Sequence, residues 1–195
     1  MTEIKSTMDL VMERAARFGK ASNEDLQRDE TRKKGMQKAA EYLEGSIASL
    51  TETLKAEKQE MQQTLRQGIA EGLLRNIFLP RDEVQQERTD KAAQGLVELS
   101  GGAGDVATIC RELQQIMQGY QQHREDLQGQ LEQQIKMQYE QMLAQRGAQG
   151  EEFNIDPTMQ PKFREEWGKI EAELHSRYHE ALEQHKINLR TRLGI

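Results

Sequence analysis

The chain has few aromatic, proline and cysteine residues, and each shortage excludes a class of structure. Aromatic residues make up 5% of its 195 residues. Because aromatic side chains supply much of the buried area of most cores, a thick globular core is not expected. The three prolines, Pro80, Pro157 and Pro161, lie between segments of helical periodicity, where a missing N–H is tolerated. The sequence therefore predicts long helices that pack through narrow apolar seams.

The sequence also lacks the features of exported, membrane-spanning and nucleic-acid-binding proteins. The single cysteine, Cys110, cannot form an internal disulfide, which fits a reducing cytoplasm. Acidic residues interrupt the apolar stretch at the N-terminus, and no run approaches the ~20 apolar residues of a membrane span. The net charge of −6 argues against general phosphate binding. We expect a cytoplasmic protein with no membrane span and no nucleic-acid partner.

Residues that favour helices, chiefly Gln, Glu, Ala, Leu, Lys and Arg, dominate the chain. The predicted fold is all-α, an elongated antiparallel bundle with coiled-coil-like long helices. Three parts are expected: an N-terminal amphipathic helix over 1–20, a long helical hairpin over 23–147 that includes a short helix over 82–99, and a C-terminal helix over 158–193 that packs on the bundle.

The N-terminal segment carries one apolar stripe. Its members alternate at steps of four and three and therefore share one helix face; they are Ile4, Met8, Val11, Ala15 and Phe18. Gly19 is a plausible stop, and Ser22 with Asp25 predicts the start of a new helix. Such a stripe suits a helix that docks in a groove of a partner.

A longer helix is predicted from Asn23 to Leu79, with two kinds of apolar spacing. A heptad seam contains Met36, Ala40, Leu43, Ile47, Leu50 and Leu54. Steps of four then connect Met61, Leu65, Ile69, Leu73 and Ile77. Gly68 and Gly72 are one turn apart, which indicates close approach of a neighbouring helix.

The densest apolar cluster comprises Leu73, Leu74, Ile77, Phe78 and Leu79, followed by Pro80. A seam needs only every third or fourth residue, so this segment has apolar side chains on several faces. We predict that this cluster is an intermolecular contact, and three occupants are considered: the short helix after Pro80, a second copy of the chain, or a protein partner. Val84, Leu96 and Leu99 are close enough in sequence to cover it within the chain. The glycine-rich stretch from Ser100 to Asp105 then predicts a loop, with Asp105 capping the next helix.

Histidines supply the most chemical-looking pattern. Glu171, His175 and His179 lie at i, i+4 and i+8 and share a helix face, where they could hold zinc. The central acid of H-E-x-x-H is missing, so the favoured interpretation is two histidines beside an apolar stripe, with no metal or other cofactor bound. His123 and His185 lie in predicted seams, where polar residues set helix register.

The opening E-I-K-S-T-M-D-L-V-M-E-R, over residues 3–14, resembles small uncharacterised bacterial helical coiled-coil proteins. That resemblance implies no activity. The mixture of heptads with steps of four is also similar to the peripheral stalk subunits of rotary ATPases, although the C-terminal third is all helical here.

The hypothesis favoured by these patterns is a non-enzymatic structural or adaptor protein that forms helix-mediated contacts with a protein partner or a second copy. A rotary ATPase stator subunit and a metal-binding helical protein that uses the Glu171, His175 and His179 face are the alternatives.

Overall fold

The computed structural model describes residues 7–145 and 156–195 of the chain. Within these residues it contains six α-helices, one 3-10 helix and no strand. The helices are α1 (Thr7–Leu43), α2 (Leu50–Lys55), α3 (Gln59–Arg75), α4 (Glu83–Leu99), α5 (Gly104–Gln145) and α6 (Pro161–Leu193), with η1 (Pro157–Met159) before α6. The all-α prediction is confirmed.

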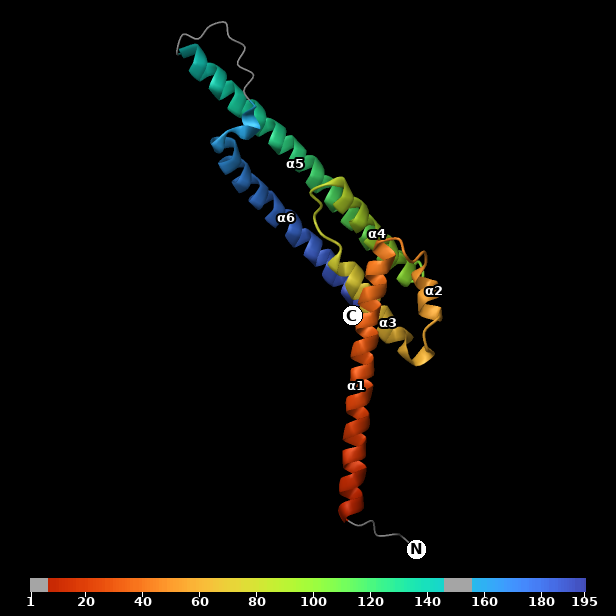
Figure 1. Cartoon of the computed structure of the whole chain (residues 1–195). Coiled ribbons are helices and arrows are strands. Elements are labelled where there is room, and N and C mark those ends of the chain that lie inside the picture. The colour runs from red at the N-terminus through yellow and green to blue at the C-terminus, as the bar shows by residue number, and fades with distance from the viewer. Residues whose placement is uncertain (1–6, 146–155) are drawn as a thin grey trace.

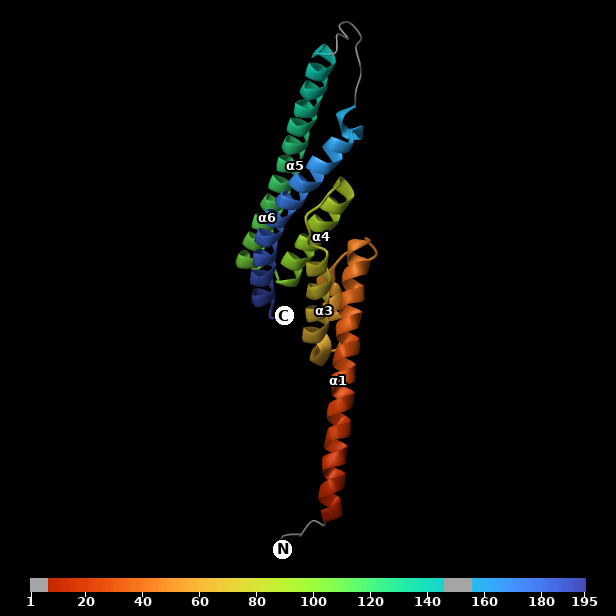
Figure 2. The ribbon, with the colours of Figure 1, turned by 90° about the vertical axis from the view of Figure 1, so that its left-hand side faces the viewer.

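The molecule is elongated, with a packed centre and a helical extension at each end (Figure 1). Helices α3, α4, α5 and α6 alternate in direction, and the long α5 and α6 form a hairpin that extends beyond α4 (Figure 2). At the other end, the N-terminal half of α1 extends beyond the remaining helices (Figure 1).

Helix α1 packs against α3 in the same direction, because the short α2 segment returns the chain to the start of α3 (Figure 1). The two backbones meet at glycines: a Cβ on Gly68 would overlap the carbonyl oxygen of Arg32. A Cβ on Gly72 would lie 2.6 Å from the Cβ of Ala39. The predicted close approach at Gly68 and Gly72 is confirmed, although the two helices are parallel rather than antiparallel.

Two predicted helix boundaries are wrong. Helix α1 continues through Gly19 and Ser22 without a break, so the described part of the predicted helix over 1–20 is not a separate helix. The predicted helix over 23–79 is instead three helices, interrupted at 44–49 and 56–58, and it ends at Arg75.

Local backbone geometry and hydrogen bonds close α1 at the first interruption. Gly45 adopts φ 84°, a left-handed conformation that ends helices after Leu43. The N–H of Ser46 donates to the carbonyl of Glu41 at 2.9 Å, and the Ser49 hydroxyl accepts the N–H of Glu52 at 3.3 Å to start α2.

Other boundaries agree with the sequence. Helix α4 begins after Asp82, whose carboxylate accepts the N–H of Gln85 at 2.8 Å. The predicted loop lies between Leu99 and Gly104, with left-handed Gly101 and Gly102. Asp105 lies in the first turn of α5 rather than before it.

Most apolar side chains that are buried belong to one core at the centre, formed by α1 to α5 and by α6 from Leu174 onward. Leu50, Leu96 and Leu113 are 0% exposed within it. A second, smaller cluster of Leu131, Ile135 and Phe163 holds the outer part of the α5–α6 hairpin together.

Candidate functional site

The predicted N-terminal stripe lies on α1, outside the packed centre. Ile4 lies outside the described residues, whereas Met8, Val11 and Phe18 fall within the bounds of α1. Side chains of α1 are described at Met12 and from residue 23 onward, and every residue over 23–30 is exposed. Two large apolar side chains on this stretch, Met12 and Leu26, are 68% and 59% exposed.

The predicted tip cluster is placed differently. Leu73, Leu74, Ile77 and Leu79 are at most 6% exposed, and all four lie in the central core with Leu96 and Leu99 of α4. Only Phe78 is half-buried. Of the three occupants considered, the short helix after Pro80 is therefore the one that the structure places there. An intermolecular contact at this cluster would have only Phe78 available.

The histidine face does not assemble a metal-ligand set. The rings of His175 and His179 stack with centroids 5.6 Å apart. The Glu171 carboxylate instead accepts a hydrogen bond from Arg124 Nε of α5 at 3.0 Å. Across residues 7–145 and 156–195, no group of three or more His, Cys, Asp or Glu residues is arranged to hold a metal ion. The metal-binding alternative gains no support from this geometry.

An aromatic and polar cluster between α5 and α6 was not foreseen from the sequence. The Tyr178 hydroxyl and His123 Nδ1 lie 2.5 Å apart and connect the two helices. Tyr120 is fully buried and packs edge-on to Tyr178, with ring centroids 5.5 Å apart. Burial raises the pKa of Tyr120, so its phenol stays protonated at neutral pH. The heptad spacing located Tyr120, but no spacing rule could pair it with Tyr178, 58 residues away in sequence.

His185 lies at the same helix contact closer to the C-terminus, but its Nδ1 makes no hydrogen bond within the described residues. Its Nδ1 lies 3.4 Å from the Glu112 carboxylate of α5, and its side chain is 25% exposed. Together with His123, it places polar groups along the α5–α6 contact.

The one cysteine is unsuited to nucleophilic chemistry. Cys110 is 4% exposed, and burial raises the pKa of its thiol to about 11. Because the thiolate is the nucleophile, this thiol is unreactive near neutral pH.

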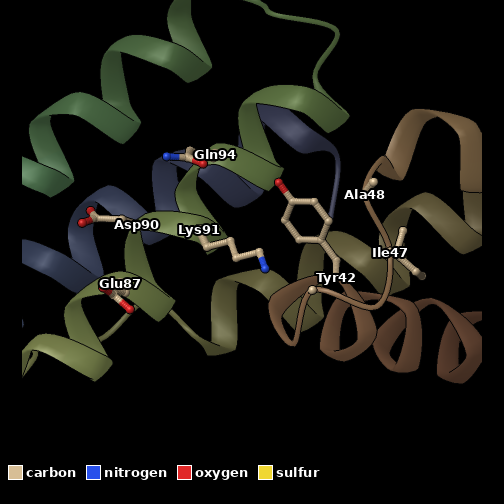
Figure 3. Close-up of a pocket in the computed structure, with 8 residues that line it drawn as sticks. Tyr42, Ile47, Ala48, Glu87, Asp90, Lys91 and Gln94 are labelled. Carbon is tan, nitrogen blue, oxygen red and sulfur yellow. The ribbon is translucent and has the colours of Figure 1, made fainter.

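An open cavity of about 480 Å³ lies where the end of α1 meets α4 (Figure 3). Its walls come from the last turn of α1 with the following loop, and from one face of α4. The lining residues are Tyr42, Gly45, Ile47, Ala48, Glu87, Asp90, Lys91 and Gln94.

Tyr42 and Lys91 lie next to each other in the wall of this cavity. Lys91 Nζ donates to the carbonyl of Leu43 at 3.1 Å and lies 5.6 Å from the centroid of the Tyr42 ring. The ring fits because Gly95 has no side chain: a Cβ there would lie 2.9 Å from Tyr42 Cε1. Burial, with a smaller effect of the Glu98 charge, raises the pKa of Tyr42.

Asp90 connects the cavity wall to α5. Its two carboxylate oxygens accept hydrogen bonds from Gln86 Nε2 at 2.9 Å and from Gln114 Nε2 at 3.2 Å. The wall of α4 is therefore held on both sides, by α1 through Lys91 and by α5 through Asp90.

Comparison with known proteins gives a family match. None of the helices within the described residues is long and apolar enough to cross a membrane. No curated protein and no solved structure matches the chain. A family model matches residues 51–191, which include α3 to α5 whole and nearly all of α2 and α6 but leave out α1. The chain therefore belongs to the family of unknown function DUF6657.

Proposed function

We propose that the chain is a non-enzymatic structural or adaptor protein of the cytoplasm that acts through helix-mediated protein–protein contacts. In this proposal, the packed centre is a support and the N-terminal part of α1 is the contact element. The partner is another protein or a second copy of the chain.

The observation that carries the proposal is the exposure of α1 before it reaches α3. Residues 23–30 are all exposed, whereas Gly35 and Ala39 further along the same helix are buried against α3. Isolated helices are marginally stable in water, and most helices gain stability by packing an apolar face. A long helix that carries an apolar stripe and has no neighbour over residues 23–30 among the described residues is therefore expected to gain a neighbour from another chain.

The exposed apolar side chains agree with this interpretation. Met12 and Leu26 are two heptads apart and therefore lie on the same side of α1. The sequence places the stripe of Met8, Val11 and Phe18 beside them. Clustered apolar groups of this kind on an exposed helix mark sites of protein interaction.

Affinity capture from the native host tests the proposal with a matched pair of variants. Phe18→Asp puts a charge into the stripe, while Gln27→Asp adds the same charge at an exposed position on the opposite side of α1. We expect quantitative mass spectrometry to find a defined set of proteins with wild type and Gln27→Asp that is lost with Phe18→Asp. Recovery of the same proteins with all three chains would contradict the proposal.

A further inference from the structure

The cavity between α1 and α4 contains a buried side chain with an unused polar group. Tyr42 is 8% exposed, yet within the described residues its hydroxyl makes no hydrogen bond. In Figure 3 the hydroxyl end of Tyr42 lies between Gln94 and Ala48, at the opening of the cavity. The Tyr42 hydroxyl is not one of the described side-chain atoms that are buried without a partner, so it is accessible from the cavity and free to bond a ligand.

The charges that line the cavity favour a positively charged ligand. Glu87 and Asp90 supply two carboxylates, against the single ammonium group of Lys91. The C-terminal end of α1, which carries the negative end of the helix dipole, also faces this region, and α1 has no basic residue in its own last turn. Lys91 reveals that the site accommodates a cation, because its ammonium group lies between the Leu43 carbonyl and the Tyr42 ring.

The remaining lining residues indicate which chemical group of the ligand carries the positive charge. Ile47 and Ala48 offer apolar contact at the edge of the cavity, opposite the polar face of α4. A guanidinium group on an aliphatic stem matches both surfaces, since its several N–H donors can bond to hydroxyl, amide and carboxylate oxygens of the kinds that line this cavity.

We propose that this cavity binds an arginine side chain of a partner protein. The inference rests on the proposed function only in that the arginine belongs to a protein. Tyr42 and Gln94 accept hydrogen bonds from the guanidinium group, Glu87 neutralises it, and Ile47 with Ala48 cover its methylene groups. Asp90, already bonded to Gln86 and Gln114, contributes charge without moving.

The test is a titration of the full chain, carrying ring-¹³C tyrosine, with acetyl-arginine amide, followed by NMR. The chain has four tyrosines, so Tyr42 is assigned by the signal that Tyr42→Phe removes, and the other three report non-specific effects. We expect a saturable shift of the Tyr42 signal alone. Acetyl-citrulline amide, which has the same shape without the charge, should produce no shift.

A matched pair of variants locates the site. Glu87→Gln should raise the dissociation constant by about fivefold, whereas Glu60→Gln, at an exposed position on α3, should leave it unchanged. The inference is overturned if the Tyr42 signal does not move, if citrulline acts like arginine, or if all four tyrosine signals move together.

The result of the arginine titration can be distinguished from the result of the capture experiment that tests the proposed function. Arginine binding together with failed capture through α1 would overturn the α1 contact and leave this inference standing. Failed arginine binding together with successful capture would overturn this inference alone.

Discussion

Glycines set the distance between α1 and α3. A Cβ on Gly35 would lie 2.8 Å from the Cα of Gly68, and one on Gly68 would overlap the backbone of Arg32. Such contacts leave no room for a methyl group on either helix. The ion pair between Arg32 and Glu71 lies beside this contact and links the same two helices.

Gly68→Ala should therefore destabilise the chain, although alanine is the better helix former. Overpacking at a backbone contact costs about 1–3 kcal/mol, and here both partners are backbone. The control is Gly129→Ala on α5, where a Cβ would meet no atom within 4 Å. That change should stabilise by roughly 0.5–1 kcal/mol. Urea unfolding measures both, and equal effects at the two sites would contradict the close helix contact.

Glu98 connects α4 to the start of α2. Its carboxylate accepts hydrogen bonds from the Ser49 hydroxyl at 2.8 Å and from the Thr51 N–H at 3.0 Å. Burial alone would raise the pKa of Glu98, but these hydrogen bonds outweigh it and the pKa is lowered from 4.5. A carboxyl whose folded pKa is lowered stabilises the fold above its unfolded pKa, and this stability is lost as pH falls through the folded pKa.

Glu98→Gln should thus lower the free energy of unfolding at pH 7 by about 1–2 kcal/mol. The loss should shrink as the pH falls below 4.5, because wild-type Glu98 then becomes protonated too. Urea unfolding at pH 7 and pH 3, with exposed Glu60→Gln as the control, measures the difference. A loss of the same size at both pH values would mean that the ionised form of Glu98 is not what binds α2.

At the scale of elements, the sequence correctly predicted that the chain forms α-helices, but it predicted the positions where the helices end less well. Similar signals, a glycine followed by a serine a few residues later, occur at Gly19 with Ser22 and at Gly45 with Ser49. Helix α1 continues through the first pair and ends at the second. At the second pair, Lys91 of α4 caps the Leu43 carbonyl, and Leu50 is buried in the core. Both contacts are distant in sequence, so local patterns could not distinguish the two pairs.

The candidate sites also differ in how far local sequence patterns can predict them. Periodicity identified the apolar stripe of α1 because only spacing along one helix is needed. The cavity at Tyr42 depends on Gly95 and Lys91, about 50 residues away, and on the turn at Gly45. The apolar cluster around Ile77 looked like surplus surface in the sequence, but the fold brings α4 over it.

The whole molecule should be far longer than a compact protein of its size. Helix α5 has 42 residues and α1 has 37, so they reach about 63 Å and 55 Å at ~1.5 Å per residue. A compact 195-residue chain would have a radius of gyration near ~16 Å. Small-angle X-ray scattering at low concentration should give a much larger radius and an asymmetric distance distribution. A value near that of the compact chain would mean that α1 or the α5–α6 hairpin folds back.

The proposal that α1 is the contact element is tested most directly by photo-crosslinking in the native host. A benzoylphenylalanine at position 18 lies in the apolar stripe, and the same residue at position 27 lies on the opposite side of α1. Illumination should produce a defined adduct from position 18, absent from position 27, that disappears when Val11→Asp is added. Adducts of equal yield from both positions, or none from position 18, would contradict a protein contact through this stripe.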